Sequence, residues 1–124
     1  MLFPLEVAAK RRILRLVEKS WRDHLQPGER LLDAELADSP KERWYASTSA
    51  LYIEDVKTSK VYPVPWHEIW EYEEQGEKNC LIRIVRVEDE QGRFEIIGRF
   101  TYYRKHFTRA VLANLDPAIC FTEL

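Results

Sequence analysis

Hydrophobic and polar residues change their spacing twice along the chain. Between residues 6 and 25 there is no glycine or proline, and the apolar side chains recur with helical spacing. They are Val7, Leu14, Val17, Trp21 and Leu25, with Ile13 and Leu16 beside them. Another face of the same helix is basic and carries Arg11, Arg15, Lys19 and Arg22. Because Pro27 and Gly28 break this pattern, we predict an N-terminal amphipathic helix that ends before them.

From residue 30 to residue 100 the apolar positions mostly alternate, as in strands that bury one face. The predicted strands cover residues 32–36, 43–48, 51–54, 61–64, 66–73, 80–84 and 94–100. In the first of these strands, Leu32, Ala34 and Leu36 are expected to form the buried face. Pro63 and Pro65 indicate that the fourth strand lies at a sheet edge. The pattern around residue 70 indicates a bulge or burial on both faces, and the polar stretch 88–92 predicts a hairpin.

Helical spacing returns between residues 103 and 115. Its apolar stripe is Phe107, Ala110, Val111, Asn114 and Leu115, and Arg104, Lys105 and Arg109 face away from it. Asp116 and Pro117 end this helix. We therefore expect an α+β, mainly β, domain over residues 27–124: a roll or barrel of about six or seven antiparallel strands, capped by a C-terminal helix. The basic helix, residues 1–26, is expected to pack on this body.

Three short motifs resemble those of bacterial pleckstrin-homology-like (PH-like) families. Residues 44–53, Trp-Tyr-Ala-Ser-Thr-Ser-Ala-Leu-Tyr-Ile, are similar to the second hairpin of those families, and residues 65–69, Pro-Trp-His-Glu-Ile, to the start of their second sheet. Gly28-Glu29-Arg30 also fits the approach to the first strand. The resemblance covers roughly residues 28–115 and implies a bacterial binding module. Residues 104–115 lack the tryptophan usual in the closing helix of eukaryotic PH domains, and the N-terminal helix is an addition to the core fold.

Charge is distributed unevenly along the chain. Residues 1–24 contain six lysines and arginines against three aspartates and glutamates, whereas the remainder is acidic. The basic helix is therefore expected to dock on an acidic body, in its own molecule or in a neighbour. A net charge of −2 gives no indication of nucleic-acid binding. No secretory signal or membrane-spanning segment is recognised, so a soluble cytoplasmic protein with a buried Cys80 thiol is expected.

Motifs for catalysis are missing from the sequence. There is no G-x-G-x-x-G or P-loop pattern, and the three histidines, His24, His67 and His106, fall on separate elements without a cysteine pair. The glutamates at positions 68, 71, 73, 74 and 77 are typical of a solvated strand face and turn. We therefore expect no enzyme activity, no cofactor and no metal site.

Two groups of residues are candidates for binding. Lys41 and Arg43 flank the first loop of the predicted sheet, and Lys57 and Lys60 belong to the third, which should lie at the same end. With Arg11 and Arg15 of the first helix, they form a candidate contact for anionic lipid or phosphoinositide. Tyr62, Trp66 and Trp70 are candidates for protein contact, or else members of the core.

These candidates leave three functional hypotheses. The first is a PH-like module for protein–protein contact or self-association. The second is a peripheral membrane module that binds anionic lipid. The third is a small-ligand-binding barrel or enzyme, which would need a roomy polar cavity.

Overall fold

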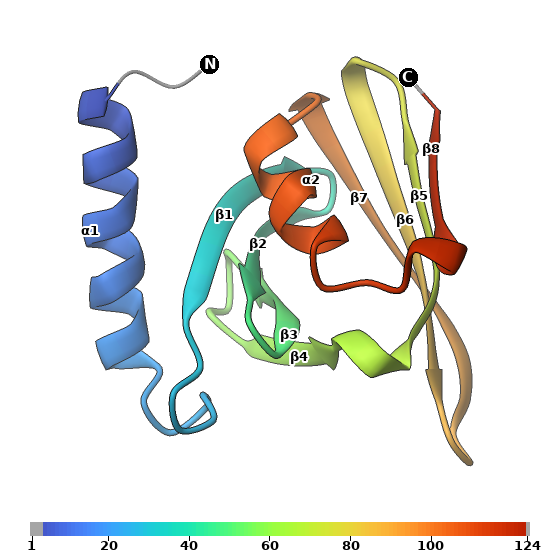
Figure 1. Cartoon of the computed structure of the whole chain (residues 1–124), viewed down its shortest axis with the longest axis horizontal. Coiled ribbons are helices and arrows are strands. Elements are labelled where there is room, and N and C mark those ends of the chain that lie inside the picture. Colours follow the sequence, from blue (N-terminus) through green and yellow to red (C-terminus); the bar gives the residue numbers. More distant parts are fainter. Residues whose placement is uncertain (1–3, 124) are drawn as a thin grey trace.

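The computed structural model describes residues 4–123, which form two sheets and two helices (Figure 1). The helix α1 covers Pro4–Ser20. Sheet A consists, in spatial order, of β1 (Leu31–Asp38), β2 (Lys41–Ser47), β3 (Ala50–Asp55) and β4 (Val61–Pro65). A 3-10 turn at Trp66–Glu68 leads into sheet B. Sheet B has the order β7 (Gly92–Tyr102), β6 (Lys78–Glu88), β5 (Ile69–Gln75) and β8 (Cys120–Glu123). The second helix, α2 (Lys105–Leu112), and a 3-10 turn at Pro117–Ile119 connect β7 to β8.

The architecture is mainly β, as predicted, but the strands do not close into a barrel. Within residues 4–123 the two sheets have separate hydrogen-bond ladders, joined at one isolated bridge between Ser39 and Arg99. β4 stays at an edge of sheet A, where Pro63 and Pro65 have no N–H to offer a further strand. The other departure is β8, which the sequence pattern did not predict and which pairs with β5 in parallel.

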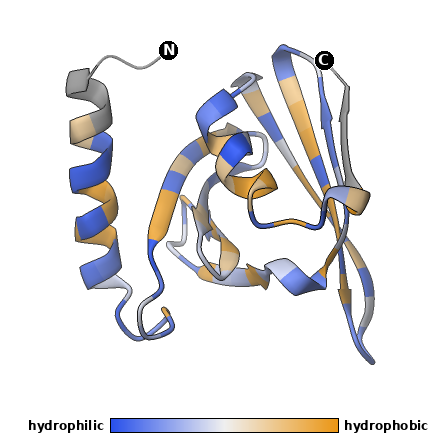
Figure 2. Cartoon of the chain, viewed as in Figure 1, coloured by the Kyte–Doolittle hydropathy of each residue, from blue (hydrophilic) through white to orange (hydrophobic). Residues whose placement is uncertain are grey.

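Both sheets bury their facing sides in one core, which α2 also enters (Figure 1). Its largest members are Trp44, Leu51, Ile53, Tyr72, Ile82, Ile84, Phe100 and Phe107. The rings of Trp44 and Phe100 meet edge to face, with centroids 5.3 Å apart. Hydrophobic and hydrophilic residues alternate along most strands (Figure 2), because successive side chains point to opposite faces.

Several details of the strand prediction are confirmed. The hairpin β6–β7 turns through residues 89–91, and Gly92, where β7 begins, has a φ of 100°, which favours glycine. The register of β5 against β6 shifts between Ile69 and Glu71, which is the bulge that the pattern around residue 70 indicated. Phe107, Val111 and Leu115 are buried in or just after α2, and Cys80 is buried on β6. The side chain of Cys120 lies outside the described part of the chain.

The prediction for β1 is wrong about which face is buried. Leu32 and Leu36 are exposed, whereas Leu31, Asp33 and Ala37 are buried. One cause is a shift in the pairing of β1 with β2 between Leu31 and Asp33. The other is that Lys10 forms ion pairs with Asp33 and Glu35, which compensate the burial of the Asp33 carboxylate.

A close approach between the sheets depends on Gly98 of β7. A Cβ atom at this position would overlap the indole of Trp44, at 2.8 Å from Cη2 and even closer to Cζ2. The tight packing of Trp44 in the core therefore requires a residue without a side chain on the facing strand.

We predict that Gly98→Ala lowers the free energy of unfolding by about 1–3 kcal/mol, because the added methyl group overpacks the core. Since phenylalanine lacks the Cζ2 and Cη2 atoms of the indole, the same substitution should cost less in a Trp44→Phe background. Chemical denaturation of the four proteins in this double-mutant cycle measures the difference. An equal cost in both backgrounds would contradict this account of Gly98.

Candidate functional site

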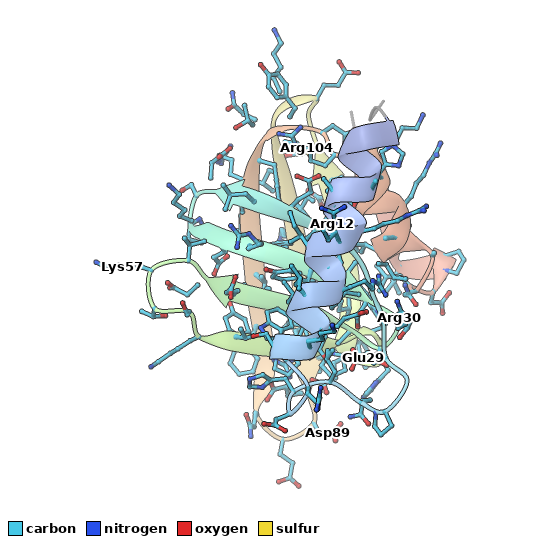
Figure 3. The ribbon with its side chains drawn as sticks, turned by 90° about the vertical axis from the view of Figure 1, so that its left-hand side faces the viewer. Arg12, Glu29, Arg30, Lys57, Asp89 and Arg104 are labelled. Atoms are coloured by element: carbon cyan, nitrogen blue, oxygen red, sulfur yellow. The ribbon has the colours of Figure 1, made fainter. Side chains whose placement is uncertain are left out.

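The first helix lies across the outer face of sheet A, the face turned away from sheet B (Figure 3). Leu14 and Trp21 are buried there against a second apolar cluster, separate from the core between the sheets. The ring of Trp21 meets that of Tyr45 edge to face, with centroids 4.5 Å apart. Tyr52 and Leu31 complete the contact. Sheet A is therefore buried on both faces, which explains why β2 and β3 carry nearly continuous apolar runs.

A buried carboxylate fixes the turn between α1 and β1. Glu29 is only 6% exposed and accepts hydrogen bonds from the hydroxyl groups of Tyr52, at 2.8 Å, and Ser47. It also accepts one from the backbone N–H of Gln26, at 2.8 Å. Burial and the neighbouring Glu29 carboxylate raise the pKa of Tyr52, so its hydroxyl stays a donor. These bonds tie the turn to β2 and β3 of sheet A.

A cluster of charged side chains holds the N-terminal half of α1 against β1. Lys10 Nζ lies 3.0 Å from Asp33 Oδ1 and 3.1 Å from Glu35 Oε1, both on β1. Burial alone would lower the pKa of Lys10, but these two carboxylates raise it above its usual value, so Lys10 is held in its charged form. Arg104, which precedes α2, lies 3.6 Å from Glu35 and connects the cluster to the second helix.

Two flanks of α1 remain at the surface, and they differ in character. The apolar flank consists of Ala9, Ile13, Leu16 and Val17. The basic flank consists of Arg11, Arg12, Arg15 and Lys19. The two sets point to opposite sides of the docked face because a helix turns by about 100° per residue.

The apolar flank borders a groove of about 520 Å³ between α1 and sheet A. Leu14 and Val17 line it from the helix, and Ala34, Leu36 and Tyr45 line it from the sheet. Three charged residues, Lys10, Glu35 and Arg43, also contribute to the lining. At its rim, Ile13 is 57% exposed and Leu36 is 39% exposed, while Leu16 further out on the helix is 59% exposed. We call this region the apolar groove.

The basic flank borders a second groove, of about 470 Å³, which we call the arginine groove. Its lining consists of Arg11, Arg15 and Arg30 together with Leu14, Leu31 and Leu32. The helix supplies half of this set, and the start of β1 and the residue before it supply the rest. Arg30 was not among the sequence candidates, because its sequence position gives no sign that it would lie beside the helix.

The structure divides the six candidate anion-binding residues into two groups. The first and third loops of sheet A do share an end, where Val56 N–H donates to the carbonyl of Lys41. Their cations lie among acids, however, and Arg43 is 3.5 Å from Glu54. Arg11 and Arg15 lie instead by Leu31, at the opposite end of β1. Lys57, at the tip of the third loop, lies on the other side of the molecule from Arg30 in Figure 3.

The three aromatic candidates for protein contact differ in how exposed they are. Trp66 is 9% exposed, and its indole N–H donates to the carbonyl of Ser47 at 2.9 Å, so it belongs to the core. Tyr62 on β4 is half-exposed, and its hydroxyl donates to Glu42 at 3.3 Å. Trp70 on β5 is 62% exposed and lies between two shallow hollows, both of which His67 also lines.

Sequence reasoning missed the most deeply buried acid among the described side chains. Glu74 was expected on a solvated face, but it is fully buried and points from β5 into the core. Tyr72 donates to its Oε1 at 2.6 Å, and within the described residues no donor lies at hydrogen-bond distance from Oε2. Burial raises the pKa of Glu74, and the hydroxyl groups of Tyr72 and Tyr103 offset only part of that rise. The alternation of β5 after its bulge is the signal that could have found it.

No family model, curated protein or solved structure matches the chain. The resemblance to PH-like families therefore stays a prediction. Among residues 4–123 there is no helix long and apolar enough to cross a membrane. The described side chains also form no cluster of three or more histidines, cysteines and acids that could hold a metal ion.

We predict that Glu74→Gln changes how stability depends on pH. A carboxyl group whose pKa is raised in the folded state contributes stability below its unfolded pKa, ordinarily 4.5, and that stability is lost as pH rises through the folded value. Glutamine does not ionise, so the variant should gain stability relative to the parent between about pH 4 and pH 7.

Chemical denaturation of both proteins across this range measures the gain. Glu73→Gln, one residue away on the opposite face of β5, is the matched control and should show a smaller change. A stability difference between Glu74→Gln and the parent that stays constant with pH would contradict the prediction.

Proposed function

We propose that this chain is a PH-like interaction module, without catalytic activity, that contacts protein surfaces and specifically binds a second copy of itself. The order of elements supports the PH-like assignment: four antiparallel strands, three further antiparallel strands in a second sheet, then a helix that packs into the core between them. The resemblance implies a bacterial protein, and we place the module in the cytoplasm, as expected from the sequence. The core is filled by large side chains such as Trp44, Phe100 and Phe107, as suits a binding scaffold.

One observation carries the proposal of self-association: the apolar groove lies beside exposed aliphatic side chains of the same helix. Docking of α1 buries the side chains of Leu14 and Trp21 but leaves those of Ile13 and Leu16 more than half exposed. Large exposed aliphatic side chains that adjoin an apolar depression are typical of protein contacts.

The arrangement favours a second copy as the partner. A ridge formed by Ile13 and Leu16 lies next to a groove with an apolar floor on the same face. A two-fold axis would place the ridge of each copy in the groove of the other, so that each contact forms twice. Leu36, on the far rim of the groove, would then pack against the partner's helix.

We predict that the protein forms a dimer at micromolar concentration and that Ile13→Gln shifts it to a monomer. The substitution removes apolar area from the ridge, while Leu14 and Trp21 still hold α1 in place. Light scattering across a concentration series measures the mass, and circular dichroism checks that the helix content is retained.

The matched control is Ile97→Gln, which changes an isoleucine 38% exposed on sheet B. This variant should dimerise as the parent does. A monomeric parent at every concentration, or equal weakening by the two variants, would contradict self-association through α1.

A further inference from the structure

The arginine groove concentrates positive charge on an apolar floor. Arg11, Arg15 and Arg30 line it, and among the described residues the acid ion-paired with this set is Glu18, which contacts Arg15 and Arg30. Three guanidinium groups against one carboxylate leave a surplus of two positive charges. Arg12 and Lys19, both exposed on the same flank of α1, extend the positive field toward solvent.

The existing contacts do not use up the donors of these arginines. A single oxygen, Glu18 Oε2, accepts from Arg15 Nη1 and from Arg30 Nε, each at 3.0 Å. Arg15 also donates through Nη2 to the carbonyl of Leu31, at 2.7 Å. Each guanidinium group carries five N–H donors, so several on Arg15 and Arg30 stay available. Arg11 has no hydrogen bond or ion pair within the described part of the chain.

The groove is also held in shape before any ligand binds. Glu18 Oε2 accepts a further bond from the backbone N–H of Leu31, at 2.8 Å, which ties the helix to the first residue of β1. The backbone of Arg30 is paired with Thr48, whose hydroxyl accepts from Arg30 N–H and whose own N–H donates to the Arg30 carbonyl at 3.0 Å. The arginines therefore project from fixed backbone, which reduces the entropy lost on binding.

We propose that the arginine groove binds a phosphate ester, with the phosphate held by Arg11, Arg15 and Arg30 and its apolar substituent against the leucines. Guanidinium groups bind phosphate oxygens through paired, charge-assisted hydrogen bonds. Leu14 and Leu31 are buried at the floor, and Leu32, 43% exposed, forms a wall. An inorganic ion would leave the Leu32 wall exposed to water, whereas an ester with an apolar substituent would cover it.

The phosphate ester can be a soluble metabolite or the headgroup of a membrane lipid, and the groove recognises the chemistry common to both. The loop cations at Lys41, Arg43, Lys57 and Lys60 are not part of this site, because they lie at the other end of β1. The site does not overlap the surface proposed for self-association, which lies on the opposite flank of α1. An experiment that disproves self-association therefore does not disprove phosphate-ester binding, and the reverse also holds.

The test uses two probes on the full chain. Phenyl phosphate is the soluble probe, followed by backbone amide NMR shifts, and vesicles of phosphatidylcholine with phosphatidic acid are the lipid probe, followed by co-sedimentation. We expect amide shifts concentrated at residues 30–32, or sedimentation that vesicles of phosphatidylcholine alone do not produce. Shifts without sedimentation identify a soluble ester, and sedimentation without shifts identifies a lipid. The absence of both overturns the proposal.

Arg11→Gln is the decisive variant, because Arg11 has no partner in the described structure whose loss could disturb folding. It should weaken binding about tenfold, as expected for the loss of one charge-assisted contact. Arg30→Gln should weaken binding by at least as much. The control is Arg109→Gln, an exposed arginine on α2, which should bind as the parent does. Equal weakening by Arg11→Gln and Arg109→Gln would show non-specific charge attraction and overturn the site.

Discussion

The hydrogen bonds to Glu29 are the constraint on which the surface of this protein depends. A carboxylate that is nearly excluded from water is costly unless donors surround it, and here Tyr52, Ser47 and the backbone of Gln26 supply them. These donors belong to β3, to β2 and to the turn itself. The turn must therefore follow the path that brings all three within hydrogen-bond distance of the Glu29 carboxylate. That path sets where α1 meets sheet A and, since Arg30 is the next residue, where the guanidinium group of Arg30 emerges.

Burial of sheet A on both faces explains why a single helix can form two different surfaces. Docking requires only a narrow stripe of α1 and the turn after it, chiefly Leu14 and Trp21, and burying each such side chain contributes about 1.5–3 kcal/mol. The remaining circumference is free to carry other chemistry. The aliphatic flank borders β1 and β2, and the basic flank borders the start of β1. Each flank thus forms a groove with a different part of the same sheet.

The sequence correctly predicted those structural features that are determined by residues close together in the chain. The hairpin β6–β7, the edge position of β4 and the bulge in β5 followed from alternation, prolines and a glycine. The buried face of β1 and the burial of Glu74 did not, because both depend on distant partners: Lys10 for Asp33, and Tyr72 and Tyr103 for Glu74. Arg11 and Arg15 were recognised as candidates, but the sequence grouped them with loop cations at the wrong end of β1. Only the path of the turn shows that Arg30 is their neighbour.

The two grooves share the docked position of α1, and this sharing has a thermodynamic consequence. If α1 leaves the sheet, the apolar groove loses one wall and the arginine groove loses Arg11 and Arg15 at the same time. Any molecule that binds either groove only when α1 is docked therefore stabilises the docked helix, by an amount that grows with the ratio of its concentration to its dissociation constant. Because such coupling is reciprocal, a ligand held by the arginines favours association through the apolar flank to the same extent that association favours the ligand. The strength of this coupling is set by how often α1 undocks, which the bonds of Glu29, Lys10 and Glu18 make rare.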